Sequence, residues 1–277
     1  VADAIKTMFK EDIVPSAADR WVFNTAPVIM MLPALLVLAV IPFSPGTFLA
    51  DINVGILFII AVTSLSTFAI VMAGWGSQNR FAMFGAVRSV GLLISYEIPM
   101  VLSLVGVLLL SQSLSLVDVV GAQTLPFILV QPLGFLVFFV ASIAEINRPP
   151  FDLAEAESEL GAGYHSDYSG MKFGLFMNGE FAATLISAAV IVTVFLSGWR
   201  GFWWLPDQAW FFLKLFGVLF FMIWTRASWP RMRIDQVMAF AWKGLLPLTL
   251  LNIVVSAIEL QIWNTPTVGQ LWIMSGI

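Results

Sequence analysis

Long apolar runs alternate with short polar segments along the chain. Seven of the runs, at roughly 21–43, 52–75, 89–111, 123–144, 173–198, 209–227 and 244–262, are long enough to cross a bilayer. Crossing about 30 Å of hydrocarbon takes about 20 helical residues. Because lipid offers no hydrogen-bond partners, a backbone inside it must satisfy its own polar groups as a helix. The pattern therefore predicts an all-α integral membrane protein, with seven transmembrane helices in one bundle over residues 1–277.

The segment before the first run has the spacing of an amphipathic helix. Its apolar residues share one helical face and its charged residues share the other: Val1, Ile5, Met8 and Phe9 against Asp3, Lys6, Lys10 and Glu11. This spacing predicts an interfacial helix that lies in the membrane plane and ends before Pro15. The helix either borders an entrance for a lipid-soluble ligand or anchors the chain, and the residues alone favour the anchor.

Composition agrees with a lipid environment. Hydrophobic residues make up 60% of the 277 residues and charged residues 11%, and the mean hydropathy is +0.94. Soluble domains carry about 25% charged residues, so we exclude soluble enzymes, free nucleic-acid binders and secreted disulfide scaffolds. The chain has no cysteine and one histidine, His165, which we expect to be an ordinary loop residue. Thiolate-bound zinc and a conventional Fe–S cluster held by this chain alone are therefore excluded, and any electron carriers lie on partner subunits.

The charged residues predict an orientation. With seven crossings, 11 of the 13 Lys and Arg residues fall on one side, and only Arg200 and Lys214 fall on the other. The positive-inside rule makes the first side cytoplasmic, with the N-terminus inside and the C-terminus outside. Most acidic residues fall on the same side. This predicts a docking face for a cytoplasmic partner, with a merely solvated surface as the alternative.

Three carboxylates fall inside the apolar runs. Glu97 lies in the third run, Glu180 about eight residues into the fifth, and Glu259 near the end of the seventh. A carboxylate at membrane depth costs roughly 2.5–3.5 kcal/mol on insertion scales, and it normally faces the bundle interior or water. For Glu97 and Glu180 we favour a role in a proton path over a structural interhelical hydrogen bond. We expect Glu259 to snorkel to the membrane surface.

The acidic loop over residues 145–172 carries the densest cluster of acids. Asp152 and Glu155 have capping-box spacing, which predicts a short helix over residues 153–160. Asp152, Glu155 and Glu159 share one face of that helix, where neighbouring like charges are destabilising. We interpret the cluster as a proton reservoir with coupled titration. A metal site is a weaker alternative, and we assign no metal ligand.

Four segments carry a resemblance to a known family: VADAIKTMFKED, GWGSQNRFAMFGAVRSVGLLISYE, EINRPPFDLAEAESELGAGYHSDYSGMKF and RASWPRMRIDQVMAFAWKGLLPLTL. On these segments, nearly the whole chain resembles the quinone-site membrane subunits of respiratory complex I, the H-type subunits of NADH:quinone oxidoreductase. The resemblance implies eight transmembrane helices, the first of which would precede residue 1. The segment GYHSDYSGMKFGLF is similar to bacterial forms, which implies a bacterial plasma (inner) membrane.

The resemblance also implies a substrate and partners. Quinone is the substrate, and it enters from the bilayer into a chamber shared with two cytoplasmic subunits, one cluster-bearing and one hydrogenase-like. The FMN and Fe–S clusters belong to partner subunits only. The remaining partners are the small and the antiporter-like membrane subunits, and no nucleic acid is involved.

By motif position, the resemblance implies two sets of site residues. A proton path toward the antiporter-like subunits would include Glu97, Glu145, Asp152, Glu155, Glu157, Glu159 and Glu180. The quinone entrance and chamber wall would include Lys6, Met8, Phe9, Arg148 and Phe151. Phe181 follows Glu180 where many relatives have tyrosine, so we expect no hydroxyl relay at that position.

The resulting hypothesis is an energy-converting subunit. Quinone reduction would change the charge near the acidic loop and thereby shift the proton occupancy of the intramembrane carboxylates. The nearest alternative is the related coupling subunit of a membrane-bound hydrogenase or formate hydrogenlyase. A stand-alone secondary transporter and a purely structural anchor are further alternatives.

Overall fold

The computed structural model describes residues 2–151, 163–201 and 205–262. All regular structure in these residues is helical. Six segments are long and apolar enough to span a membrane: α2 (Arg20–Val40), α3 with α4 (Gly55–Gly76), α5 (Arg80–Ser111), α10 (Gly170–Phe195), α11 (Asp207–Ser228) and α12 through α13 (Ile234–Ile262). The predicted all-α membrane bundle is therefore confirmed.

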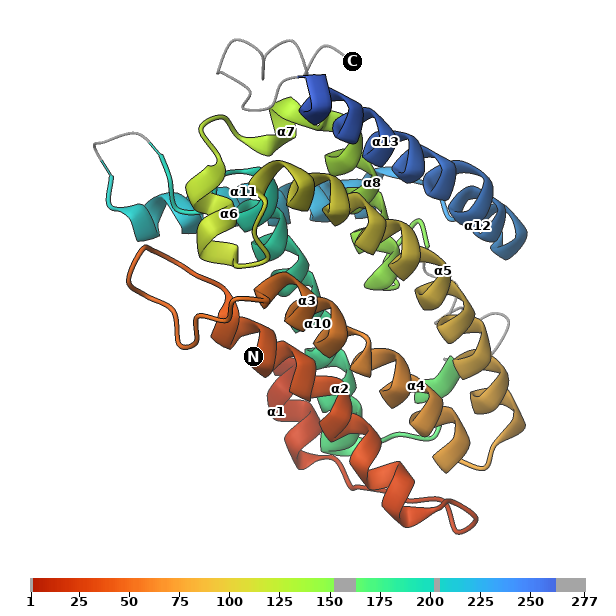
Figure 1. Cartoon of the computed structure of the whole chain (residues 1–277). Helices are drawn as coiled ribbons and strands as arrows, with labels where there is room; N and C mark the ends of the chain where they lie inside the picture. Colours follow the sequence, from red (N-terminus) through yellow and green to blue (C-terminus); the bar gives the residue numbers. More distant parts are fainter. Residues whose placement is uncertain (1, 152–162, 202–204, 263–277) are drawn as a thin grey trace.

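The spanning helices pack as an extended bundle (Figure 1). Helix α2 packs against both α4 and α10, α4 packs against α5, and α5 packs against α8 (Pro132–Glu145) and α13 (Leu246–Ile262). Helix α11 packs mainly against α10. Two helices thus have central places: α5 joins α4 to α8 and α13, and α10 joins α2 to α11.

The fourth apolar run differs from the prediction. In place of one helix over 123–144, the structure has α7 (Phe127–Val130) and α8, which are separated at Gln131 and preceded by the short α6 (Leu116–Ala122). Pro126 and Pro132 lack backbone N–H groups and so favour helix starts over helix interiors. The 14 residues of α8 extend about 21 Å at 1.5 Å per residue, less than a full hydrocarbon crossing.

The third and seventh runs form longer segments than predicted. Helix α5 begins at Arg80 and not at residue 89, because the Asn79 side chain caps it by accepting a hydrogen bond from the Phe81 N–H. The last segment begins with α12 (Ile234–Phe240) and continues into α13 through a π-helical turn, η2 (Ala241–Leu245). In the second run, α3 (Gly55–Thr63) and α4 (Leu65–Gly76) meet at Ser64.

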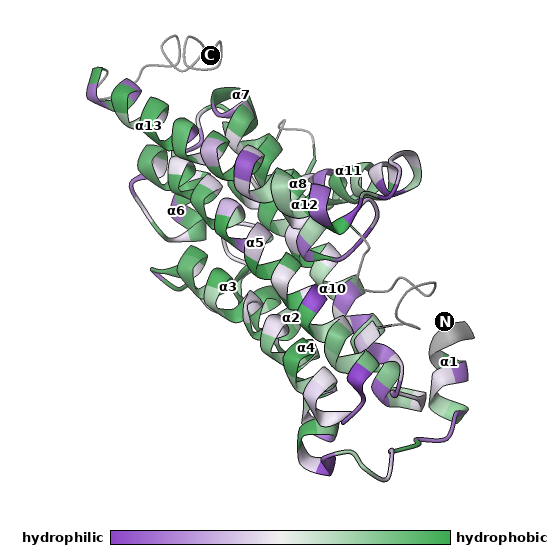
Figure 2. Cartoon of the chain, turned by 90° about the vertical axis from the view of Figure 1, so that its right-hand side faces the viewer, coloured by the Kyte–Doolittle hydropathy of each residue, from purple (hydrophilic) through white to green (hydrophobic). Residues whose placement is uncertain are grey.

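Most of the helical residues are hydrophobic (Figure 2), and many large apolar side chains are exposed on the outside of the bundle, as lipid contact requires. Helix α11 shows this most clearly, since Phe216, Phe220 and Ile223 are all exposed. These side chains would be unfavourable in water and favourable against lipid tails. The burial pattern therefore agrees with the predicted lipid environment.

Helix α10 is attached at both ends. At its C-terminal end, Lys214 of α11 donates hydrogen bonds to the carbonyls of Leu196 and Gly198, at 2.7 and 3.0 Å. A cation suits this place because the last carbonyls of a helix lack helical partners and carry partial negative charge. At its N-terminal end, Lys172 forms a 2.8 Å ion pair with Asp12, which follows α1 (Ala2–Phe9).

Candidate functional site

Glu180 of α10 is the best-buried carboxylate among the predicted site residues that the structure describes, with 4% of its side chain exposed. Three polar side chains surround it. Arg148 Nη2 lies 3.3 Å from Oε2, His165 Nε2 lies 3.4 Å from Oε1, and the Tyr164 hydroxyl donates to Oε1 at 3.3 Å. The chain thus supplies a cation and two further polar groups that offset the cost of burying this charge.

The three partners come from two segments beyond α10. Arg148 follows α8 directly, whereas Tyr164 and His165 belong to the single 3-10 turn η1 (Gly163–His165), which packs against α5. Glycine at position 85 allows this contact, because a Cβ there would lie 2.7 Å from the Gly163 Cα atom. The close approach of η1 to α5 therefore holds both rings beside Glu180.

His165 is not the ordinary loop residue that we expected. It is buried, its ring stacks obliquely on Tyr164 with 3.8 Å between ring centroids, and it contacts Glu180. The sequence signal that could have identified it is its place as the one histidine, five residues before the start of a helix that carries a buried glutamate. Tyr164 supplies the hydroxyl that Phe181 cannot supply.

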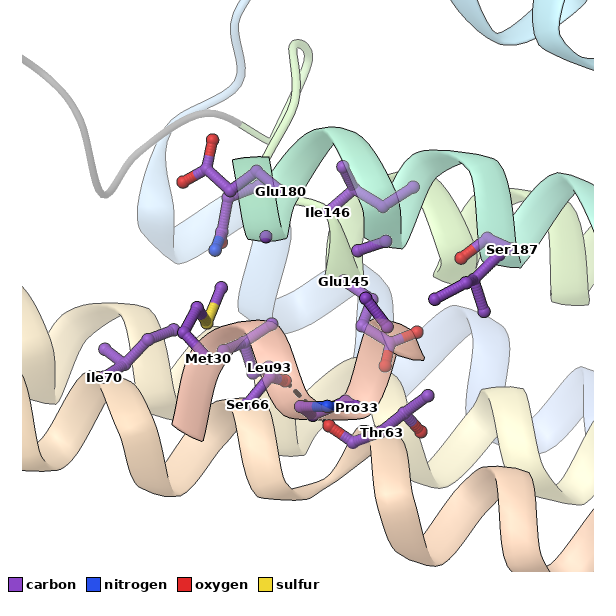
Figure 3. A pocket seen from close by; sticks show the side chains of 15 residues that line it. Met30, Pro33, Thr63, Ser66, Ile70, Leu93, Glu145, Ile146, Glu180 and Ser187 are labelled. Carbon is purple, nitrogen blue, oxygen red and sulfur yellow. Dashed lines mark hydrogen bonds between the residues drawn. The ribbon is translucent and has the colours of Figure 1, made fainter. Parts of the chain in front are cut away.

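A small cavity of about 50 Å³ lies next to this cluster and between α2, α4 and α10. Glu145 and Glu180 both line it, together with polar residues such as Thr63, Ser66 and Ser187. Figure 3 shows the carboxylates of Glu145 and Glu180 at separate places along α10, with Glu145 directed toward the side of Thr63. Most of the cavity wall is apolar, but a space of this size can hold one or a few water molecules beside the polar groups that line it.

Glu97 lies in α5 and is half-buried. It is close enough to Glu145, at the end of α8, for its negative charge to act on that carboxyl group. Helices α5 and α8 pack together, which explains why these two acids approach each other. Glu97, Glu145 and Glu180 therefore come from three different helices, α5, α8 and α10.

A larger pocket of about 470 Å³ lies between α1 and α10. Lys6 lines it, as do Tyr168, Phe173 and Phe181, whereas Met8 and Phe9 are exposed on α1 and 87% of Phe9 is uncovered. Burial raises the pKa of Tyr168, with a further contribution from the negative charge of Asp167, so its phenol stays protonated. The pocket thus combines aromatic side chains with several polar groups, two of them lysines, and such a mixture can hold a small organic ligand.

The other predicted residues lie apart from these pockets or outside the described residues. Phe151 is buried against Tyr96, with 5.1 Å between ring centroids. Asp152, Glu155, Glu157 and Glu159, and the helix predicted over residues 153–160, lie outside the described residues. In the part of the chain that the structure describes, no group of three or more histidine, aspartate or glutamate side chains could hold a metal ion.

Comparison with known proteins gives a consistent result. The sequence profile of the NADH dehydrogenase family matches residues 1–257. A Dehalococcoides mccartyi protein (strain CBDB1), named as the H subunit of NADH-quinone oxidoreductase, is 53% identical over 262 residues, which cover 95% of this chain and 74% of the relative. Proteins of the same name from Geobacillus kaustophilus and Anoxybacillus flavithermus are each 49% identical, over 93% and 95% of this chain and 79% and 80% of theirs.

Proposed function

We propose that the buried carboxylates of this chain couple quinone reduction to proton translocation, because the chain belongs to the NADH dehydrogenase family, with the H subunits of NADH-quinone oxidoreductase. Membership of this family gives the general function, which is that of a multi-pass membrane subunit of complex I. The names of the relatives also favour this function over the hydrogenase alternative. The proposal adds how this chain's own residues take part.

The observation that carries the proposal is a chain of contacts from the larger pocket to the buried acid. Phe181 lines the pocket between α1 and α10. The Arg148 guanidinium lies over its ring, 5.0 Å from the centroid, and pairs with Glu180 at 3.3 Å. A change of charge or contact in the pocket therefore alters the position of Arg148, and with it the charge that stabilises ionised Glu180.

The pocket between α1 and α10 is the proposed quinone entrance. Its volume of about 470 Å³ and the rings of Tyr168, Phe173 and Phe181 suit a hydrophobic ring, while the Lys6 ammonium group can donate to polar oxygens. Exposed Met8 and Phe9 would hold α1 at the membrane surface beside this opening. Phe151 and Arg148 would border the chamber further in.

The proposed proton path runs through the acids of α5, α8 and α10. Glu180 would take up or release a proton when Arg148 moves, and Glu145 and Glu97 would pass it on toward α5 and the antiporter-like partners. The acids of the 145–172 loop, Asp152, Glu155, Glu157 and Glu159, would supply protons from the cytoplasmic side. Partner subunits would carry the FMN and Fe–S clusters, and the chain would sit in a bacterial plasma membrane with its N-terminus in the cytoplasm.

The test uses the assembled complex in inverted membrane vesicles. The Glu180→Gln variant keeps the shape of the side chain and removes its charge. We expect the number of protons pumped per NADH oxidised to fall several-fold, while NADH oxidation by quinone falls less. The Asp51→Asn variant, which changes an exposed carboxylate between α2 and α3, is the matched control.

An assembled Glu180→Gln complex that pumps as many protons per NADH as the unmodified complex would overturn the proposal. If this variant fails to assemble, the Tyr164→Phe variant provides a milder test, because it removes only the hydroxyl that donates to Glu180. Reduced pumping per NADH is again the expected result, and unchanged pumping contradicts the proposal.

A further inference from the structure

Helix α13 is polar on the face that it buries. Its buried residues are Thr249, Asn252, Ser256 and Glu259. Their spacing of three, four and three residues places them in one stripe along the helix. The opposite face carries exposed Leu251, Val254 and Ile258. This is the reverse of a soluble helix, and it places a row of polar groups inside the bundle against α5 and α8.

The middle of the stripe meets Gln131, at the break between α7 and α8. The Gln131 Nε2 group donates to the carbonyl of Gly106 at 3.1 Å and to the Ser256 hydroxyl oxygen at 2.7 Å. Both hydrogens of this amide are thereby used. Because the Gly106 carbonyl can only accept, the side-chain amide orientation is fixed, and its oxygen Oε1 points elsewhere.

Two buried polar atoms here have no hydrogen-bond partner among the described residues. They are Gln131 Oε1 and Asn252 Nδ2, on side chains that are 4% and 7% exposed. Both lie beside Gly106, where an added Cβ would be 2.8 Å from each of them. One is an acceptor and the other a donor, so a single water molecule could accept from Asn252 and donate to Gln131.

Glu259 extends the same stripe toward the end of the bundle. We expected this side chain to snorkel, but it is 8% exposed and its Oε1 atom also has no partner among the described residues. A buried carboxylate oxygen inside a membrane bundle is stable when water or another polar group reaches it. The unpartnered oxygen of Glu259 therefore points to bound water, as do the unpartnered side-chain atoms of Gln131 and Asn252.

We propose that this seam between α5, α8 and α13 is a water-binding site, with a file of ordered water running from Glu259 inward to Gln131 and Asn252. The water satisfies the unpartnered atoms and brings the Glu259 carboxyl into contact with solvent at the C-terminal end of α13. The seam is separate from the cluster around Glu180. The proposal goes beyond the coupling function and does not depend on it.

The first test is cysteine accessibility in the assembled complex. The chain has no cysteine of its own, so one introduced thiol is unique in it. Thiol reagents react with the thiolate, which requires water. With a small, water-soluble methanethiosulfonate reagent, we expect the Glu259→Cys and Asn252→Cys variants to be labelled, whereas the lipid-facing Val254→Cys control on the same helix is not. Quinone reductase activity of the membranes confirms assembly of each variant.

A second substitution closes the seam. Gly106→Ala places a methyl group 2.8 Å from both unpartnered atoms, whereas Gly91→Ala on the same helix meets nothing within 4 Å. In the Asn252→Cys background only Gln131 Oε1 remains of the two atoms, and Gly106→Ala still fills the space beside it. Gly106→Ala is therefore expected to slow labelling several-fold and Gly91→Ala to leave it unchanged.

The unmodified complex provides the second measurement. A density map that resolves water should show a molecule between Gln131 Oε1 and Asn252 Nδ2. Labelling of Asn252→Cys no faster than Val254→Cys overturns the proposed file of water. A map in which the two amides bond directly to each other overturns the site itself. Neither result would change the outcome of the Glu180→Gln pumping test.

Discussion

At the scale of single residues, Glu180 depends on partners that come from distant parts of the chain. Glu180 stands out in the sequence because a carboxylate deep in an apolar run needs a reason to be there. Arg148 is separated from it by 32 positions, and His165 and Tyr164 reach it only because η1 folds against α5. Nothing in local spacing predicts a contact that depends on the packing of three distant segments.

The ion pair between Arg148 and Glu180 gives the first prediction. Replacing Arg148 by leucine leaves the buried Glu180 charge without its nearest cation, and breaking a buried pair costs about 3–5 kcal/mol. We expect the Arg148→Leu variant to assemble poorly and to lose thermal stability. The amount of complex in membranes and the melting temperature of the purified complex measure this effect.

A double variant separates charge from packing. If the unpaired charge causes the loss, adding Glu180→Gln to Arg148→Leu restores assembly without restoring proton pumping. A double variant as unstable as Arg148→Leu alone would show that packing of the arginine against Phe181 matters more than the charge.

At the scale of elements, the apolar runs predicted most of the helices but not where some of them break or begin. Hydrophobicity is continuous across Gln131, so the run over 123–144 indicated one helix, although Pro126 and Pro132 were visible in it. The first turns of α5 contain Arg80 and Arg88, which lower hydropathy without preventing a helix. Hydropathy reports on lipid exposure, whereas helix ends depend on capping groups and proline.

The contact between α5 and η1 gives the second prediction. A methyl group on Gly85 would lie 2.7 Å from the Gly163 Cα atom, and backbone there cannot move aside as a flexible side chain can. Overpacking of this kind costs about 1–3 kcal/mol and would displace η1, with Tyr164 and His165, from Glu180. We expect Gly85→Ala to lower both assembly and pumping.

The control for the Gly85→Ala variant lies on the same helix, α5. Gly91→Ala adds the same methyl group to α5 where nothing lies within 4 Å. Its complex should match the unmodified one in amount and activity. Equal behaviour of the two variants, measured side by side in vesicles, would contradict a tight contact between α5 and η1.

At the scale of the whole molecule, the sequence predicted the environment correctly because composition alone determines it. A chain with 60% hydrophobic and 11% charged residues cannot cover itself with a polar surface. The structure adds that polar groups lie inside, around Glu180 and along α13, while large apolar side chains such as those of Phe216 and Phe220 are exposed on the outside. The direction in which each polar side chain points is a property of the assembled bundle.

The apolar exterior gives the third prediction. Phe216 lies near the middle of α11 and is exposed. Aspartate at the centre of a membrane helix costs roughly 3 kcal/mol more than phenylalanine on insertion scales. We expect Phe216→Asp to reduce the amount of this chain in the membrane, and Phe216→Leu to leave it unchanged. Quantitative immunoblots of membrane and soluble fractions measure the difference, and normal insertion of the aspartate variant would contradict lipid exposure of this face.

The attachment of Lys214 to the last carbonyls of α10 has a mechanical consequence. A helix that is held at one end can tilt about that end, but it cannot slide along its axis. If protonation of Glu180 displaces α10, the helix must therefore tilt about its C-terminal end, where Lys214 holds it. The largest movement would then occur at the N-terminal turns, where the half-exposed Lys172–Asp12 ion pair holds the helix less strongly and Phe173 forms one wall of the pocket beside α1.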